Sequence, residues 1–314
     1  MADNDGHWER GVIEKLATAA LKEQRRARLW GIFFKLLTFA YLTVAILLWV
    51  DWKDRGELTD GKHTALVEVS GLIGPGTDAS ADRISTALQS AFKDKNTQGV
   101  VLRINSPGGS PVQAQNIYDE MRRLRQKYPG IPLYVVVDDL CASGGYYVAV
   151  GADKIYVNKT SVVGSIGVRL DGFGVTGLME KLGIERRLLT AGENKGFLDP
   201  FLPLDEKQKQ YALALINDVH QQFIHVVREG RGKRLKETPD MFSGLIWTGQ
   251  KSVELGLADG FGSLDYVARE VIKAEQVVDF TQKENIAEKF ARRFGAGVAS
   301  ALVEIAMKSA PALR

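Results

Sequence analysis

Two short loops contain the residue types that could do chemistry. The first, NSPGGS at residues 105–110, follows an apolar run and precedes a helical pattern. The adjacent Gly108 and Gly109 let the backbone approach a ligand closely and turn its N–H groups outward. Before a helix, such N–H groups form an anion site or an oxyanion hole. A plain strand-to-helix turn also tolerates Pro-Gly-Gly, so the loop by itself leaves both interpretations open.

The second loop, CASGGYY at residues 141–147, places Ser143 after an apolar run and at the start of a small-residue helix. The helix dipole favours negative charge developing at this point, as a nucleophilic serine requires. A serine here is equally typical of a helix N-cap, and the loop does not choose between the two roles. Cys141, the single cysteine, suits a small buried hydrophobic residue better than a nucleophile.

A nucleophilic serine needs a base, and the four histidines are poor candidates. They are His7 before an apolar N-terminal run, His63 in a charged linking segment, and His220 and His225 in one amphipathic helix. A lysine whose positive charge is disfavoured by burial is the alternative base. Lys195, in the sequence GENKGFLDP, differs from the other lysines only in its loop of glycines and a proline.

The composition narrows the classes of function that these residues can serve. Lys and Arg total 41 against 38 Asp and Glu, and the net charge of +3 argues against a dedicated nucleic-acid-binding protein. The glycine loop lacks the Lys-Ser/Thr ending of a phosphate-binding P-loop, so nucleotide binding is not expected. We expect neither a metal site nor a cofactor.

An apolar stretch at residues 30–50, with Lys35 as its single charge, is long enough to cross a bilayer as a helix. Tryptophans at both ends match interfacial anchors. Four basic residues lie just before the stretch, within residues 22–28, which predicts a cytoplasmic N-terminus. We therefore expect a cytoplasmic tail over residues 1–29, a single anchor in the cytoplasmic (inner) membrane, and a tether over residues 51–63 that leads to an extracytoplasmic domain.

Beyond the tether, short apolar runs alternate with helical patterns. Three such runs start 35 and then 33 residues apart, at residues 65–69, 100–104 and 133–137, and a fourth covers residues 154–157. The longest helical patterns cover residues 112–128 and 205–229. Continuous apolar runs of this length predict parallel strands buried on both faces and joined by right-handed crossovers. The sequence thus predicts an α/β fold with a repeated βαβ core, forming one domain over residues 64–280.

The C-terminal residues 281–314 have apolar side chains at four-residue spacing, with basic residues beside them. This pattern predicts an amphipathic helix. It favours packing on its own domain or on a neighbouring subunit, and attachment to a membrane surface is the alternative.

Four motifs in order, behind an N-terminal anchor, resemble the signal peptide peptidase A family of membrane-anchored Ser–Lys peptidases, in its short single-domain form. The motifs are NSPGG at residues 105–109, ASGGYY at 142–147, VGSIGV at 163–168, and TGQ followed by GLAD within 248–259. The resemblance covers roughly residues 63–272 and implies the Clp protease/crotonase fold.

This resemblance also implies a role for each site residue. Ser143 is the nucleophile, and Lys195, 52 residues later, is the general base. Ser165 orients that lysine, and the N–H groups of Gly109 and Gly144 form the oxyanion hole. The expected substrates are apolar remnants of signal peptides or other peptides released from membranes. Family members form ring- or dome-like homo-oligomers in which neighbouring subunits complete each site, so we expect a homo-oligomer.

Two other functions are weighed against the peptidase. A non-catalytic membrane scaffold of the same fold would be expected to lose at least one of Ser143, Lys195, Gly109 and Gly144, and all four are present. A crotonase-like acyl-CoA enzyme shares the fold and an oxyanion loop. However, an outward-facing site has no obvious supply of acyl-CoA, and the Ser-Gly-Gly stretch would remain unexplained.

Overall fold

The computed structural model describes residues 5–55 and 61–282, so the predicted C-terminal helix lies outside the described residues from residue 283 onward. The chain separates into two units, one containing α1 and the other covering Thr59–Asn285. The first unit is built on α1 (Asp5–Arg55), a single helix of 51 residues. Within the described residues, one helical stretch, Leu21–Ile46, is long and apolar enough to cross a membrane.

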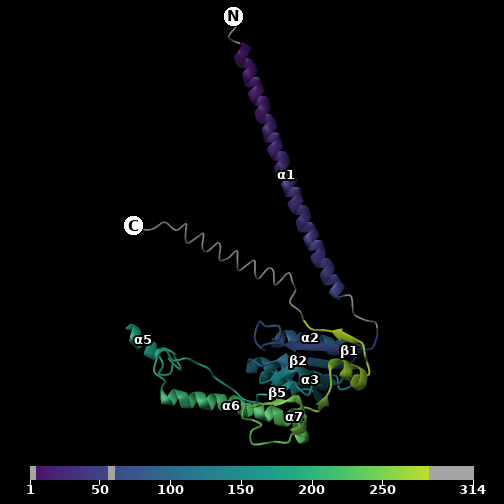
Figure 1. The fold of residues 1–314 in the computed structure, drawn as a ribbon, viewed down its shortest axis with the longest axis vertical. Coiled ribbons are helices and arrows are strands. Elements are labelled where there is room, and N and C mark those ends of the chain that lie inside the picture. Colours follow the sequence, from purple (N-terminus) through teal and green to yellow (C-terminus); the bar gives the residue numbers. More distant parts are fainter. Residues whose placement is uncertain (1–4, 56–60, 283–314) are drawn as a thin grey trace. The chain divides into compact units, whose positions relative to one another are not determined.

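The second unit is an eight-stranded sheet with helices packed on it (Figure 1). Its strands are β1 (His63–Ser70), β2 (Thr97–Ser106), β3 (Leu133–Ala142), β4 (Lys154–Val157), β5 (Val162–Gly164), β6 (Ile246–Thr248), β7 (Gly260–Phe261) and β8 (Val277–Asp279). Its helices are α2 (Ala81–Lys93), α3 (Pro111–Lys127), α4 (Gly144–Ala149), α5 (Thr176–Leu182), α6 (Glu206–Arg231), η1 (Gly232–Arg234), α7 (Gly249–Glu254), α8 (Leu264–Tyr266) and η2 (Val267–Ile272). The main strand order is β6-β5-β3-β2-β1-β8, and off this path β4 pairs with β3 and β7 pairs with β4.

The central strands are parallel and buried on both faces. Ala65 pairs with Val100, and Val100 pairs with Leu133, so alternate residues of the three strands point to the same side. One side joins the main core with α2, α3 and α4, whereas Val101 and Val136 pack with Val267 of η2 on the other side. Because helices cover both faces, the strands read as continuous apolar runs. The predicted α/β class is confirmed.

The carboxyl ends of four strands meet at one edge of the sheet. Strand β3 pairs with β4 over its first half and with β5 over its last three residues. The last pairs along this edge are Ser70 with Asn105, Ser106 with Cys141, and Ala142 with Gly164. The loops that follow β1, β2, β3 and β5 therefore start side by side, where α/β proteins build their sites.

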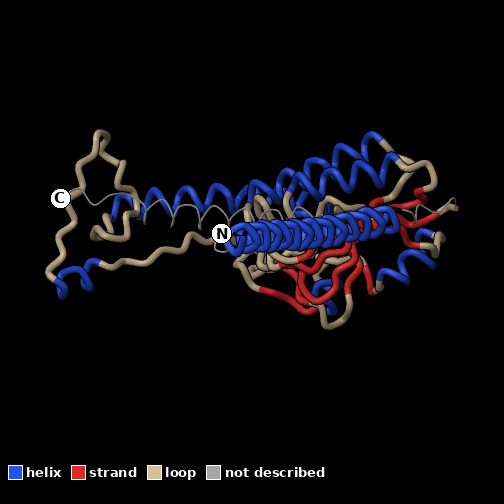
Figure 2. Tube along the Cα trace, turned by 90° about the horizontal axis from the view of Figure 1, so that it is seen from above, coloured by secondary structure: helices blue, strands red, loops and turns tan. Residues whose placement is uncertain are grey.

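Residues 167–205 form an arm that leaves the sheet. It contains α5, none of whose residues is buried. Figures 1 and 2 both show α5 and its neighbouring loops clear of the strands, beyond the outer end of α6. The arm is fixed to the first turns of α6, where the rings of Phe197 and Tyr211 lie 5.7 Å apart and the Leu198 N–H donates to Gln208 Oε1 (3.1 Å).

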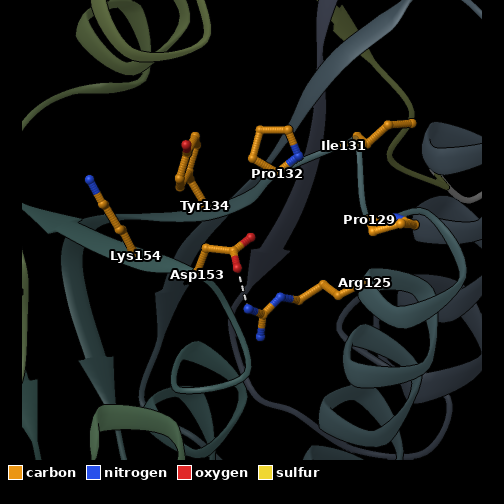
Figure 3. A pocket seen from close by; sticks show the side chains of 7 residues that line it. All are labelled: Arg125, Pro129, Ile131, Pro132, Tyr134, Asp153 and Lys154. Carbon is orange, nitrogen blue, oxygen red and sulfur yellow. Dashed lines mark hydrogen bonds and ion pairs between the residues drawn. The ribbon is translucent and has the colours of Figure 1, made fainter. Parts of the chain in front are cut away.

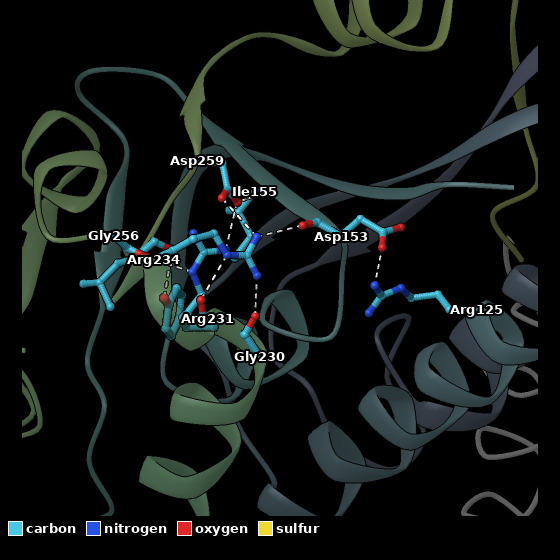
Figure 4. Close-up of polar contacts among 10 residues, drawn as sticks. Arg125, Asp153, Ile155, Gly230, Arg231, Arg234, Gly256 and Asp259 are labelled. Carbon is cyan, nitrogen blue, oxygen red and sulfur yellow. Dashed lines mark hydrogen bonds and ion pairs between the residues drawn. The ribbon is translucent and has the colours of Figure 1, made fainter. Parts of the chain in front are cut away.

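A buried ion pair joins the last residue of α6 to the loop before β7 (Figure 4). The Arg231 side chain is 1% exposed, and its Nη1 donates to Asp259 Oδ2 at 2.8 Å. The same carboxylate accepts the Ile155 N–H of β4 at 2.7 Å. Burial acts to raise the pKa of Asp259, but the hydrogen bond and the charge of Arg231 outweigh it and hold that pKa below its ordinary value.

We predict that Asp259→Asn destabilises the folded protein by about 3–5 kcal/mol, because it leaves the buried Arg231 charge without its partner. Since folding lowers the Asp259 pKa, the pair stabilises above the ordinary carboxyl pKa and loses its effect as the pH falls through the folded-state value. The melting temperature of the wild type in detergent should therefore fall on acidification below about pH 4. The melting temperature of Asp259→Asn should fall less over the same pH range, whereas the control Asp218→Asn, at an exposed position, should behave as the wild type does. A pH dependence of Asp259→Asn equal to that of the wild type would contradict the role given to the Asp259–Arg231 pair.

Candidate active site

Ser143 lies in a strained turn between β3 and α4. Its backbone angles, φ 52° and ψ −124°, are those of the first central residue of a type II′ turn, a position that usually requires glycine. Holding a residue with a side chain there costs on the order of 1–3 kcal/mol, and such strain is typical of catalytic serines on strand-to-helix turns. The hydroxyl makes no cap hydrogen bond to α4. The helix-cap role that the sequence left open is therefore not the role of Ser143.

Two backbone N–H groups that have no partner among the described residues lie next to this serine. Neither Gly109 nor Gly144 donates its N–H to another described residue. The two residues are neighbours, because a Cβ built on Gly144 would lie 3.2 Å from the Gly109 nitrogen. Paired free donors beside a serine at a helix N-terminus are the arrangement that stabilises an oxyanion. The structure thus brings together the three residues predicted as nucleophile and oxyanion donors.

Close backbone contacts hold the glycine loop in place. A Cβ on Gly108 would lie 2.5 Å from the Gly144 nitrogen, and one on Gly109 would lie 2.0 Å from the Ile73 carbonyl oxygen. Both glycines also have positive φ, 95° and 147°. The loop after β1 completes the clamp, since Ile73 donates to the Gly108 carbonyl at 2.8 Å and accepts from the Ser110 N–H at 2.8 Å. A side chain at either glycine would therefore displace a predicted oxyanion donor.

Ser106 also holds the glycine loop in place, a role that no sequence pattern indicated. Its buried hydroxyl donates to the Gly71 carbonyl at 2.6 Å and accepts the Gly108 N–H at 3.1 Å. One hydroxyl thus joins the end of β2 to the loop that follows β1 and to the loop that follows β2. The partner at Gly71 is 35 residues away in sequence, so no local pattern could have indicated the contact.

Ser165 lies beside the nucleophile, on the continuation of β5. The carbonyl of the preceding Gly164 accepts the Ser143 N–H at 2.8 Å, and the Ser165 N–H donates to the Leu245 carbonyl at 2.8 Å. Ser165 also has a positive φ of 52°, rare for a residue with a side chain. This geometry places Ser165 next to Ser143, and no hydrogen bond of its hydroxyl to another described residue is present.

Lys195 is not brought to the other site residues within one chain. It lies in the arm, exposed, and its side chain makes no hydrogen bond or ion pair with the described part of the chain. The nearby Phe197 contacts Tyr211 in the first turns of α6. His220, farther along α6, is the residue whose ring contacts Ile166 beside the site. Nine helical residues span about 14 Å, a separation longer than a lysine side chain.

The core next to the site contains Cys141, Tyr146 and Tyr147 among its buried residues. Cys141 is fully buried, and burial raises the pKa of its thiol, which agrees with a packing role. Tyr146 of α4 is also buried and donates its hydroxyl to the Leu257 carbonyl at 2.8 Å. Burial likewise raises the pKa of Tyr147 to about 12. Tyr146 thus anchors α4 to the loop that follows α7, and the Tyr147 ring packs against Tyr118 of α3 and Phe223 of α6.

A separate cavity of about 350 Å³ lies at the opposite edge of the sheet (Figure 3). It is lined by Arg125, Pro129, Ile131, Pro132, Tyr134, Asp153 and Lys154. Tyr134 and Lys154 stand at the starts of β3 and β4, and Arg125 is held by Asp153 and by the Gly151 carbonyl. None of the predicted catalytic residues lines this cavity.

Comparison with known proteins identifies two matching families and several relatives. The family model of peptidase family S49 matches residues 125–278, and the Clp protease family model matches residues 67–161. The protease SohB of Haemophilus influenzae is 32% identical over 76% of this chain and 67% of its own length. Protease 4 of the same organism is 29% identical over 69% of this chain and 35% of its own length.

A third relative is a Brucella melitensis protein named as the Na(+)/H(+) antiporter NhaA, which is 42% identical over 63% of this chain. The matched region spans 28% of that protein. The chain therefore covers between about a quarter and two thirds of the length of these three relatives.

The matches define a Clp protease-like fold and place the chain within a peptidase family. The chain belongs to peptidase family S49. The family prediction drawn from the four sequence motifs is thereby confirmed.

We predict that Gly108→Ala slows acylation of Ser143 by a fluorophosphonate at least about a hundredfold. The added methyl group would collide with the Gly144 nitrogen and the Ser143 Cβ, and alanine disfavours the positive φ. The labelling rate of the purified full-length protein measures the effect. Gly130→Ala is the matched control, because a Cβ there meets open space, and it should label at the wild-type rate. Equal labelling of both variants would contradict the oxyanion assignment.

Proposed function

We propose that this protein is a membrane-anchored serine endopeptidase in which Ser143 is the nucleophile and Lys195 of a neighbouring copy is the general base. The observation that carries the proposal is the strained backbone of Ser143, whose hydroxyl does not cap α4. Beside it lie the N–H groups of Gly109 and Gly144, which have no partner among the described residues. Membership of peptidase family S49 supports the same reaction. The stretch Leu21–Ile46 supplies the membrane anchor.

The chemistry follows from these positions. The uncharged amine of Lys195 takes the proton of the Ser143 hydroxyl while its oxygen attacks the peptide carbonyl, and the Gly109 and Gly144 N–H groups hold the oxyanion. The carbon–nitrogen bond then breaks, the leaving amine takes the proton from the lysine, and an acyl-enzyme remains. Water, deprotonated by the same lysine, attacks the acyl carbon. The bond from that carbon to the Ser143 oxygen breaks, and the oxygen takes the proton back from the lysine. Ser165 orients the lysine beside the nucleophile.

The exposed arm supports assembly with further copies of the chain. Phe173 and Leu189 are 87% and 97% exposed, and α5 buries none of its own apolar residues. Such a surface normally packs against another protein. A neighbouring copy that covered the arm would take Lys195 out of water, which favours the uncharged amine that a base requires. Assembly as a homo-oligomer would thus complete each site.

The proposed substrates are apolar peptides, such as remnants of signal peptides or other peptides released from membranes. Leu72 and Val112, which are 59% and 65% exposed, lie on the two segments that flank Gly109. They offer apolar contacts to a substrate held beside the oxyanion donors. The basic residues before the anchor favour a cytoplasmic N-terminus in the inner membrane, so that the peptidase domain faces outward, toward exported peptides.

Mixing two inactive variants tests the shared site. Ser143→Ala and Lys195→Ala should each abolish cleavage of an apolar peptide, because each lacks one member of the dyad. Random one-to-one assemblies of the two should regain roughly a quarter of wild-type activity, since some sites combine an intact serine with an intact lysine from the neighbour. The rate of peptide cleavage by co-expressed, differently tagged chains measures this recovery.

Co-expression of Ser143→Ala with the double variant lacking both residues is the control, and it should stay inactive. Mixed assemblies that contain both tags and remain inactive would rule out a base supplied by a neighbour. Full activity of Lys195→Ala by itself would show that another group is the base.

A further inference from the structure

Helix α6 forms one wall behind the nucleophile. Its Phe223 ring lies 5.1 Å from the ring of Tyr147 in α4, and Gly230 packs so closely on α4 that an added Cβ would lie 2.3 Å from the Val150 carbonyl oxygen. His220 lies one turn before Phe223 on the same face of α6, because residues three apart are neighbours on a helix. This places a partly buried imidazole beside the site, although the sequence pattern indicated only a surface or packing residue.

The imidazole makes a specific hydrogen bond to the turn that carries Ser165. His220 Nε2 lies 3.2 Å from the Ile166 carbonyl oxygen. A carbonyl oxygen can only accept, so Nε2 carries the hydrogen and donates. Because this bond needs only the Nε2 hydrogen, the neutral and the protonated ring both form it.

The bonded turn, residues 164–166, is strained and is held from three sides. Gly164 and Ser165 have φ values of 115° and 52°. The Gly164 carbonyl accepts the Ser143 N–H from the nucleophile turn, and the Ser165 N–H donates to the Leu245 carbonyl. The third tie is His220, and it is the one made by a side chain. Loss of that tie frees the Ile166 end of the turn, which is next to Ser165 and two residues from the Gly164 carbonyl that accepts the Ser143 N–H.

We propose that His220 is a positioning residue for the Ser143 site, acting by holding the turn at residues 164–166 through its Nε2–H. The inference rests on the proposed function, because it assigns His220 a part in the reactivity of the same serine. His220 touches neither the nucleophile nor the substrate in this role. Its contribution is the geometry of Ser165 and of the Gly164 carbonyl.

Three variants of the full-length protein test the proposal. His220→Phe keeps a ring of similar size but removes the donor, and His220→Gln keeps an N–H donor. His225→Ala, an exposed histidine of the same helix, is the matched control. The measurements are the rate of Ser143 acylation by a fluorophosphonate, kcat and KM for an apolar peptide, the melting temperature and the size of the assembly.

We expect His220→Phe to lower both the acylation rate and kcat by at least about fivefold, the value of one hydrogen bond, with KM unchanged within about twofold. His220→Gln should recover most of the rate, and His225→Ala should match the wild type. An acylation rate in His220→Phe equal to that of the wild type would overturn the proposal. An equal loss of acylation rate in His220→Phe and His220→Gln would also overturn it. So would a loss that is fully explained by a smaller folded or assembled fraction of the variant protein.

The same experiment separates this inference from the proposed function. Absence of labelling in the wild type, or labelling retained in Ser143→Ala, would refute the serine peptidase assignment itself. Normal labelling of the wild type together with normal labelling of His220→Phe would refute only the role of His220.

Discussion

The hydrogen bond from the Ser143 N–H to the Gly164 carbonyl is the contact on which the candidate site depends (2.8 Å). It extends the pairing of β3 with β5 by one step and fixes Ser143 in a conformation that costs on the order of 1–3 kcal/mol. That strain persists because the surroundings permit no relaxed alternative. Gly108 fills the space beside Ser143, and α4 begins at the next residue. The strain keeps the hydroxyl away from the helix N–H groups it would otherwise cap.

Buried packing behind the site supplies the rigidity that the strained turn needs. Tyr146 ties α4 to the Leu257 carbonyl, and the neighbouring Asp259 binds both β4 and the last residue of α6 through Arg231. A buried ion pair of this kind contributes less to net stability than its distances suggest, because both charges have left water. Its more specific consequence is geometric, since it fixes where α6 ends relative to the sheet. The part of α6 that carries His220 and Phe223 is thereby held in place next to the site.

Helix α6 also joins two parts of the unit with opposite character. Its last turns are buried against α4, whereas its first turns carry an arm in which Phe173 and Leu189 are 87% and 97% exposed. A single copy therefore brings Ser143 together with Gly109 and Gly144, whereas Lys195 lies away from them in the arm. In the proposed mechanism, a free monomer would lack its base, so that peptide cleavage would require assembly.

Much of this architecture follows from local sequence patterns. The apolar runs predicted the positions of β1 to β4, because side-chain periodicity acts over a few residues. The Gly-Gly and Ser-Gly-Gly loops made Ser143, Gly109 and Gly144 candidates, and their roles were implied by the family resemblance. The sequence also determined the family through the order of its four motifs. It did not reveal the short strands β5 to β8, the arm around α5, or the roles of Ser106 and His220. The contacts of Ser106 and His220 join residues 35 and 54 positions apart, which no local period encodes. Only the tertiary structure decided that the Ser143 hydroxyl does not cap α4 and that Lys195 lies away from Ser143, because both depend on where distant backbone segments meet.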